Sequence, residues 1–417
     1  MNKKIEIMAP VGSFEALHAA INAGADSVYF GIEQLNMRAR AANNFTTEDL
    51  KEIVKICQEK DVKTYLTLNT VMYDHDITLM KTICDTAKEA GLTAVILSDI
   101  AALQYARSIG LEVHMSTQTN ITNMEAVKFY AQFSDVIVLA RELTLKQIES
   151  ITNQIKEEDI RGPKGELIQI EIFVHGALCV AISGKCYMSL ATYNSSANRG
   201  VCLQNCRRSY KLIDDETGDE LRVENKYIMS PKDLCTIGFI DKLIDAGVSV
   251  FKIEGRGRAP EYVDTVVRCY KEAVESYYDN TYTPEKIAVW TTKLESVFNR
   301  GFWHGGYYLG KQLGEWSGKY GSHATEEKQY LGRITNYYNQ KEVGEFHLET
   351  GEITTGDTLL VTGPTTGVVR ATVEEIHTDD GTVVKAVKGD IITIKVPTKV
   401  RKNDKFFKLI DVAKCQK

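Results

Sequence analysis

The sequence has no apolar run long enough to cross a membrane, and its opening residues, MNKKIEIMAP, lack the apolar core of a secretion signal. We therefore expect a cytoplasmic protein with no membrane partner. Because the cytosol keeps thiols reduced, its nine cysteines are not expected to form disulfides. A formal net charge of −6 gives no general excess of positive charge. Any contact with nucleic acid must come from a local basic patch.

Several short catalytic motifs are also missing. The chain contains no HExxH, GxSxG or P-loop motif, so zinc hydrolysis and a nucleophile elbow have no local support. It has no Cys-x-x-Cys pair either, because three residues separate Cys202 from Cys206. Such pairs are usual in structural zinc sites, so the pattern does not favour zinc. The pattern is compatible with an iron–sulfur cluster, because the spacing of the cysteines that bind such clusters varies widely.

Length and composition predict a multidomain globular protein. With 417 residues, 43% of them hydrophobic and 25% charged, the chain can build two or three domains. Short apolar runs alternate with amphipathic helical patterns, which is typical of parallel α/β folds. Eight runs favour a TIM-like (β/α)8 barrel, with an open doubly wound sheet as the alternative. The expected strands are Ile5–Ala9, Ser27–Ile32, Lys63–Leu68, Ala94–Leu97, Glu112–Met115, Val136–Leu139, Ile168–Val174 and Ser249–Ile253.

After the eighth expected strand, the alternation of strand and helix patterns ends. A helix from Glu261 to Tyr278 completes a barrel region expected at 1–280, with a cysteine-rich loop region inserted at about 176–240. Residues 281–328 combine a helical pattern with a stretch rich in glycine and aromatic residues, and form the expected linker. From 329 to 417, strand-length runs are divided by Gly, Asp and Asn turns, which predicts a small C-terminal all-β barrel.

The carboxyl ends of the expected strands are polar, and parallel barrels place their active sites at this face. His175 follows the seventh strand and Glu254 the eighth, so both are catalytic candidates, although a lone histidine is as often structural. Glu254 with Arg256 is also compatible with a buried ion pair that closes the barrel. Arginines near this face suit carboxylates or phosphates, with solvated loop charges as the alternative. The substrate-binding candidates are Arg38, Arg40, Arg141, Arg207 and Arg256.

The most unusual stretch follows the seventh strand. Clustered thiols in a reduced protein predict metal ligands or a redox centre, and ordinary buried cysteines are the alternative. Cys57, Cys84 and Cys269, each on an expected helix, are read as ordinary buried cysteines. A fifth thiol of this face, Cys235, follows an expected strand at 227–229 and begins an expected helix that ends at Ala246. The four clustered cysteines are Cys179, Cys186, Cys202 and Cys206.

A basic patch occurs near the C-terminus. Between Lys385 and Lys408 the chain has eight Lys or Arg residues against two acidic ones. The pattern predicts an RNA-facing surface that includes Lys399, Arg401 and Lys402, with a simple basic β surface as the alternative.

The stretch after the seventh strand resembles the signature of the collagenase-like peptidase family, position for position. The phrases APVGSFEAL, STQTNITN, NRGVCLQNCRRSY, SPKDLC and KIEGR look like the same family, so the likeness covers nearly the whole chain. Within the family, the sequence is most similar to bacterial tRNA uridine hydroxylases that depend on prephenate. The C-terminal region resembles the second domain of elongation factor Tu. The signature residues are Glu171, Phe173, Gly176, Ala177, Leu178, Cys179, Gly184, Cys186, Met188 and Ser189.

The resemblance implies a specific chemistry. It implies a 4Fe-4S cluster and oxygen-independent hydroxylation of the wobble uridine in a tRNA anticodon to 5-hydroxyuridine, with prephenate as co-substrate. It also implies that a paralogous family member can serve as a heterodimer partner. The competing readings are a peptidase, for which the family is named, and a non-catalytic RNA-binding or maturation factor. Carried over by position, the cluster ligands are Cys179, Cys186, Cys202 and Cys235, with Cys206 as the alternate fourth ligand.

Overall fold

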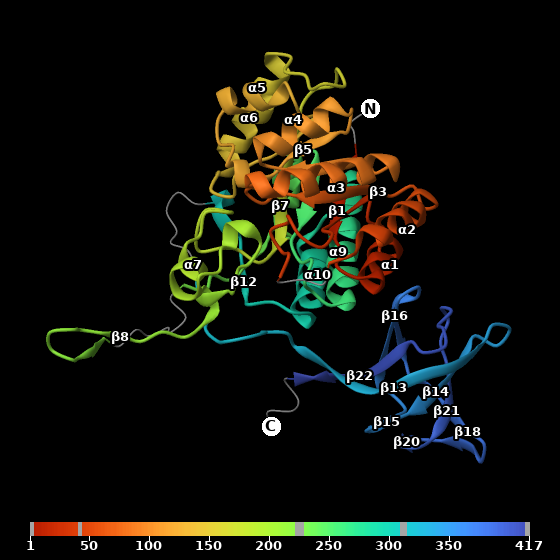
Figure 1. Cartoon of the computed structure of the whole chain (residues 1–417). Coiled ribbons are helices and arrows are strands. Elements are labelled where there is room, and N and C mark those ends of the chain that lie inside the picture. The colour runs from red at the N-terminus through yellow and green to blue at the C-terminus, as the bar shows by residue number, and fades with distance from the viewer. Residues whose placement is uncertain (1–3, 41–43, 222–228, 309–314, 413–417) are drawn as a thin grey trace.

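The computed structural model describes residues 4–40, 44–221, 229–308 and 315–412. Eight parallel strands form a closed barrel, and an antiparallel all-β region follows it (Figure 1). The ring closes because β11 pairs in parallel with both β1 and β7. The predicted fold class is therefore confirmed. The barrel strands are β1 (Glu6–Pro10), β2 (Ser27–Phe30), β3 (Lys63–Leu68), β4 (Ala94–Leu97), β5 (Val113–Met115), β6 (Val136–Val138), β7 (Gln169–Gly176) and β11 (Val250–Ile253).

Amphipathic helices alternate with these strands and bury their apolar faces against the barrel. In α2, for example, Leu50, Ile53 and Val54 are buried, and Thr46 and Asp49 form a reciprocal cap at its first turn. No helix in the described part of the chain combines the length and the apolar character needed to span a membrane. The helices are α1 (Phe14–Asn22), α2 (Thr47–Gln58), α3 (Ile77–Glu89), α4 (Ile100–Ser108), α5 (Met124–Ala131), α6 (Leu145–Glu157), α8 (Ile240–Asp245), α9 (Pro260–Tyr278) and α10 (Pro284–Ser296).

A long insertion follows β7. Its hairpin, β8 with β9, projects away from the barrel (Figure 1). Its last strand, β10, runs antiparallel to the end of β7, with Cys235 opposite His175. Most of the short strand expected at 227–229 lies outside the described residues. The elements are α7 (Met188–Tyr193), two 3₁₀ turns (Ala197–Arg199 and Asn205–Arg207), β8 (Leu212–Ile213), β9 (Glu220–Leu221) and β10 (Asp233–Cys235), and β12 (Phe302–Trp303) later pairs with β10.

The helix expected from Cys235 to Ala246 is wrong in its first turn. Cys235 ends strand β10, and the helix α8 begins only at Ile240. Strand pairing with β7 satisfies the backbone of this stretch, and a glycine, Gly238, lies between the strand and the helix. Cys235 is therefore held by the sheet edge and not by a helix N-terminus.

The C-terminal region has its own apolar core, which includes Leu331, Phe346 and Phe406. It packs on the barrel through α1, because Ala19 is buried together with Leu360 and Phe407. Eight strands form one sheet, and β15 and β20 form a separate pair. The strands are β13 (Glu326–Tyr338), β14 (Val343–Leu348), β15 (Glu352–Thr354), β16 (Thr358–Gly363), β17 (Gly367–Thr372), β18 (Ile376–Thr378), β19 (Gly381–Val383), β20 (Lys385–Val387), β21 (Ile391–Lys395) and β22 (Lys405–Asp411).

Candidate functional site

A cavity opens at the carboxyl ends of the barrel strands, as expected for a parallel barrel. We call it the barrel cavity. Strand β11, the loops after β2, β6 and β11 and the start of the cysteine loop supply its charged residues, and polar side chains such as Asn69 and Gln118 also line it. The charged side chains and the thiol that line it are Arg38, Arg141, Lys252, Glu254, Arg256 and Cys179.

Glu254 is the anion of the barrel cavity. Its Oε1 accepts a hydrogen bond from Nη2 of Arg38 at 2.8 Å. Burial alone would raise the pKa of Glu254, but Arg38, Arg141 and Arg256 together bring it down to about 2. The carboxylate is therefore ionised at neutral pH, so Glu254 holds arginines in place and is no proton donor.

Positive charge exceeds negative charge in this cavity. Arg256 is buried, and burial lowers its pKa to about 10, so it stays charged while its Nη1 donates to Thr67 Oγ1 at 2.8 Å. Arg141 donates from Nη1 to the carbonyl oxygen of Ala177 at 2.9 Å. Its buried Nε has no hydrogen-bond partner among the described residues. Buried donors in native proteins are nearly always paired, so this nitrogen calls for an acceptor such as a ligand or an ordered water.

Lys252 contributes less to this excess, because it already has a carboxylate partner. Its ammonium lies 2.7 Å from Glu171, and both side chains are almost fully buried. Arg38, Arg141 and Arg256 thus share one anion, Glu254. The candidates Arg40 and Arg207 do not line the barrel cavity: Arg40 is exposed, and Arg207 belongs to the neighbouring cavity.

His175 is buried behind the mouth of the barrel. It lines neither the barrel cavity nor the neighbouring cavity that contains Arg207. Its Nδ1 lies 3.4 Å from the hydroxyl of Tyr270 on α9, and its ring packs edge-on against Phe302. Burial, with a smaller effect of Arg258, lowers the pKa of His175 to about 3. The ring is neutral at physiological pH, which fits a packing role better than proton transfer.

A second cavity adjoins the first and contains most of the clustered thiols. We call it the thiol cavity. Arg38, Cys179 and Glu254 line both cavities, so they form a common wall. Arg300, which follows α10, was missed in the sequence because nothing in its local pattern separates it from other surface arginines. The thiol cavity is further lined by Cys202, Cys206, Arg207, Arg258 and Arg300.

Four thiols of the cysteine loop lie within electrostatic reach of one another. Burial raises the pKa of Cys206, Arg207 opposes this rise, and Cys179, Cys202 and Cys186 add to it. All eight cysteines in the described residues are free thiols. Clustered thiolate donors are the ligands that iron–sulfur clusters require, so the donor chemistry fits such a group. In the described part of the chain, no three ligand side chains are already grouped closely enough to hold a metal ion.

Cys235 is placed differently. Its sulfur lies 4.0 Å from the hydroxyl of Tyr270, and burial raises its pKa to about 11. It does not line the thiol cavity, whereas Cys206 does. The structure thus brings Cys206, and not Cys235, to the cavity that Cys179 and Cys202 line.

The basic C-terminal patch lies beside α1. Lys399, Arg401 and Lys402 are exposed, and none of them lines the barrel cavity or the thiol cavity. Arg401 donates from Nη1 to Thr365 O and to Thr366 Oγ1, both at 3.0 Å. Its guanidinium therefore also holds the turn before β17, which packs on α1.

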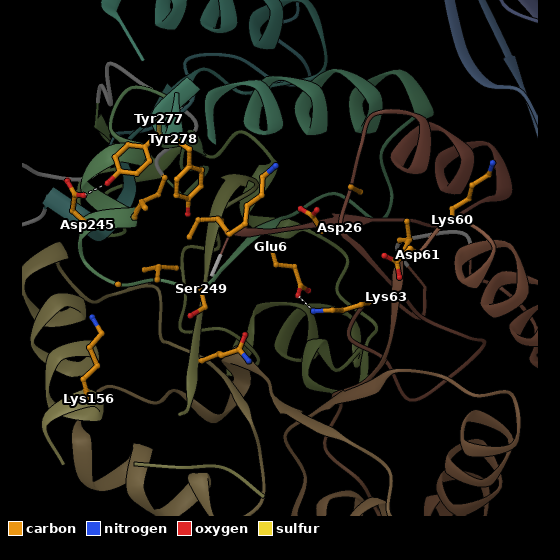
Figure 2. Close-up of a pocket in the computed structure, with 18 residues that line it drawn as sticks. Glu6, Asp26, Lys60, Asp61, Lys63, Lys156, Asp245, Ser249, Tyr277 and Tyr278 are labelled. Carbon is orange, nitrogen blue, oxygen red and sulfur yellow. Dashed lines mark hydrogen bonds and ion pairs between the residues drawn. The ribbon is translucent and has the colours of Figure 1, made fainter. Parts of the chain in front are cut away.

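A larger cavity, of about 770 Å³, opens at the opposite end of the barrel (Figure 2). Two of its carboxylates have partners within the cavity: Glu6 binds Lys63 at 2.5 Å, and Asp245 accepts a hydrogen bond from Tyr277. It lies at the amino ends of the strands, far from the cysteine loop, where barrels use their residues for stability. Its size therefore does not make it the candidate site.

Comparison with known proteins identifies the family of this chain. Residues 12–318 match the family described as Peptidase family U32. A Porphyromonas gingivalis protein named collagenase is 59% identical over 97% of this chain and 97% of its own length. The tRNA hydroxylation protein P1 of Bacillus subtilis is 29% identical over 95% of this chain and 92% of its own. An Escherichia coli synthase of 5-hydroxycytidine in 23S rRNA is 36% identical over 66% of this chain and 40% of its own.

Relatives named as collagenases and relatives named for RNA hydroxylation thus both resemble this chain, as the signature predicted. The family match spans the barrel after β1, the cysteine loop and most of the linker. The chain belongs to peptidase family U32.

Proposed function

We propose that this protein hydroxylates the wobble uridine of tRNA to 5-hydroxyuridine without molecular oxygen, with a 4Fe-4S cluster and with prephenate as co-substrate. The observation that supports this most is the common wall of the two cavities. One thiol, Cys179, faces both a cavity rich in arginine and a cavity rich in thiols. An organic acid in one cavity would thus lie beside a cluster in the other.

The barrel cavity suits a molecule with carboxylate groups. Arg38, Arg141 and Arg256 exceed the single anion Glu254, and the free Nε of Arg141 lacks an acceptor. Guanidinium forks bind carboxylates in two-point geometry, and prephenate carries two carboxylates. The ionised Glu254 fixes Arg38, so the residues here bind and orient the acid and exclude water from it.

The cluster in this proposal is held by Cys179, Cys186, Cys202 and Cys206. Cys206 replaces Cys235 of the expected set, because it lies within electrostatic reach of the other three and lines the thiol cavity. A bound cluster supplies redox or Lewis-acid chemistry beside the acid. The protein's own contribution is positive charge, since Arg38 lies near Cys179 and Cys202, and Arg207 near Cys206, where they would balance the negative charge of a thiolate-bound cluster.

The peptidase reading rests on the name of the 59% identical relative. The candidate residues of the site do not suit peptide hydrolysis. His175 is buried and neutral, it contacts Tyr270 instead of a nucleophile, and Glu254 is committed to arginines. Peptide hydrolysis needs a base or metal next to an accessible nucleophile or water. Neither candidate residue provides this arrangement.

Expression in a bacterial strain that lacks its own tRNA hydroxylation proteins tests the proposal. Mass spectrometry of tRNA nucleosides should then show restored 5-hydroxyuridine, and the anaerobically purified protein should be brown with about four irons per chain. Cys179→Ala should abolish both. A colourless, iron-free anaerobic preparation, or tRNA without 5-hydroxyuridine beside clear peptide hydrolysis, would contradict the proposal and favour the peptidase.

A further inference from the structure

The thiol cavity contains more positive charge than its carboxylates can balance. Arg38 is paired with Glu254 at 2.8 Å, and Arg300 with the buried Asp233 at 3.2 Å. Arg207 bonds only to neutral acceptors, among them Ser230 Oγ at 3.0 Å and the carbonyl oxygen of Pro231 at 2.8 Å. Neither Arg207 nor Arg258 forms an ion pair within the described residues.

Aromatic packing holds two of these arginines side by side. The guanidinium carbon of Arg258 lies 3.6 Å from the centre of the Phe298 ring, and that of Arg300 lies 5.1 Å from the same ring. A stacked guanidinium keeps its N–H edge free for an anion. Arg207, Arg258 and Arg300 therefore present donors to one cavity of about 120 Å³.

The thiol cavity continues into a groove between the barrel and the C-terminal sheet. Arg258 lines both, and the groove has a volume of about 460 Å³. Lys319, Glu327 and two ion pairs, Lys328 with Glu261 and Arg370 with Glu326, border it. Lys319 is exposed and forms no ion pair in the described part of the chain. A groove of this size beside a partly buried arginine cluster offers more room than a single small ion needs.

We infer that Arg207, Arg258 and Arg300 form a phosphate subsite, which holds the backbone of a single-stranded RNA segment where it passes from this groove to the thiols. The inference rests on the proposed RNA substrate and names the residues that position it. A phosphodiester carries one negative charge and offers two oxygens to guanidinium forks, so it would balance part of the charge of Arg207 and Arg258 beside the paired Arg300. The small acid is accommodated separately, in the barrel cavity.

The uncompensated arginines have one competing use, which is to balance the thiolates of a bound cluster. The position of Arg258 speaks for phosphate, because this residue borders the groove as well as the thiol cavity. If the arginines bind phosphate, removing their charge should lower RNA affinity. If they balance the thiolates, it should lower the iron content.

Binding of an unmodified tRNA transcript to the full-length, anaerobically purified protein tests the subsite. Arg258→Gln should weaken binding about 10-fold and lower the slope of log affinity against log salt by about one unit, while the iron content stays at the parent level. Arg258→Lys should keep the slope but not the full affinity. Arg161→Gln, at the opposite end of the barrel, is the matched control and should change neither.

Each outcome decides something. Unchanged affinity and salt slope in Arg258→Gln, with the parent still binding and modifying tRNA, would overturn the subsite and leave the proposed function standing. Loss of iron with unchanged RNA affinity would assign the arginines to the thiolates and overturn it as well. A parent protein that does not bind the transcript at all would overturn both the subsite and the proposed function.

Discussion

Two neighbouring titratable residues at the strand ends are fixed in opposite ways by their surroundings. His175 is kept neutral because it is buried without a carboxylate, so its pKa falls to about 3. Glu254 is kept ionised because three arginines outweigh its burial, so its pKa falls to about 2. Neither residue exchanges a proton near neutral pH. The site thus resembles an electrostatic cradle for anions more than an acid–base pair.

The buried neutral His175 should make the protein sensitive to mild acid. Its folded pKa of about 3 lies below the unfolded value of 6.5, so the unfolded chain binds one more proton between these two pH values. Stability should therefore fall as the pH drops, by about 2 kcal/mol between pH 7 and pH 5 from this residue alone. In urea unfolding, His175→Gln should lose about 2 kcal/mol less unfolding free energy than the parent between pH 7 and pH 5, whatever its stability at pH 7. The exposed His377→Gln should keep the parent's pH dependence; equal pH dependence in both variants would contradict the buried, neutral assignment.

Serine substitutions separate the two candidates for the fourth cluster ligand. Cys206→Ser should lose most of the iron and the brown colour, because Cys206 lines the same cavity as Cys179 and Cys202. Cys235→Ser should keep both, because its thiol packs against Tyr270. Iron analysis after anaerobic purification measures the difference. The reverse pattern would restore the ligand set that the family resemblance implies.

At the scale of secondary structure, the elements predicted from local pattern agree closely with the structure. The expected strand at Lys63–Leu68 and that at Ala94–Leu97 are β3 and β4 to the residue, because short apolar runs between turn residues specify buried parallel strands. The misplaced helix start at Cys235 has a non-local cause, since β10 exists only through its pairing with β7. Arg300 was missed for the same reason, because its place at the thiol cavity depends on the linker folding back to the barrel.

The loop after β11 is held in position by charge. Glu254 pairs with Arg38 from the loop after β2 and lies close to Arg141 and Arg256. Glu254→Gln preserves the shape but leaves three buried or partly buried cations without their anion, which should cost on the order of 3 kcal/mol of stability. Thermal or urea unfolding measures the loss, with the exposed Glu327→Gln as control. If both variants unfolded alike, Glu254 would not be the anion that holds this end of the barrel.

At the scale of the whole molecule, the barrel carries the cavities and the C-terminal sheet sets one side of the groove that leads to them. The two parts meet through a small apolar contact, in which Ala19 of α1 packs on Leu360 and Phe407. Lys328 adds an ion pair to Glu261 of α9 at 2.7 Å. Because the groove exists only while the two parts are docked, the docking contact should matter for a large substrate and not for the cluster.

Gly367 lies close to the backbone of α1 in this contact, which allows a clean test. A Cβ at Gly367 would lie 2.8 Å from the backbone nitrogen of Ala19, so Gly367→Ala should push the sheet away from α1. The residue also has a positive φ of 72°, which by itself disfavours alanine. Gly356→Ala is the matched control, because its φ is 91° and nothing lies within 4 Å of the added Cβ. Small-angle X-ray scattering should show a larger radius of gyration for Gly367→Ala alone, with tRNA binding weakened several-fold and iron content unchanged. Equal tRNA affinity in the two variants would mean that RNA does not bind across the groove.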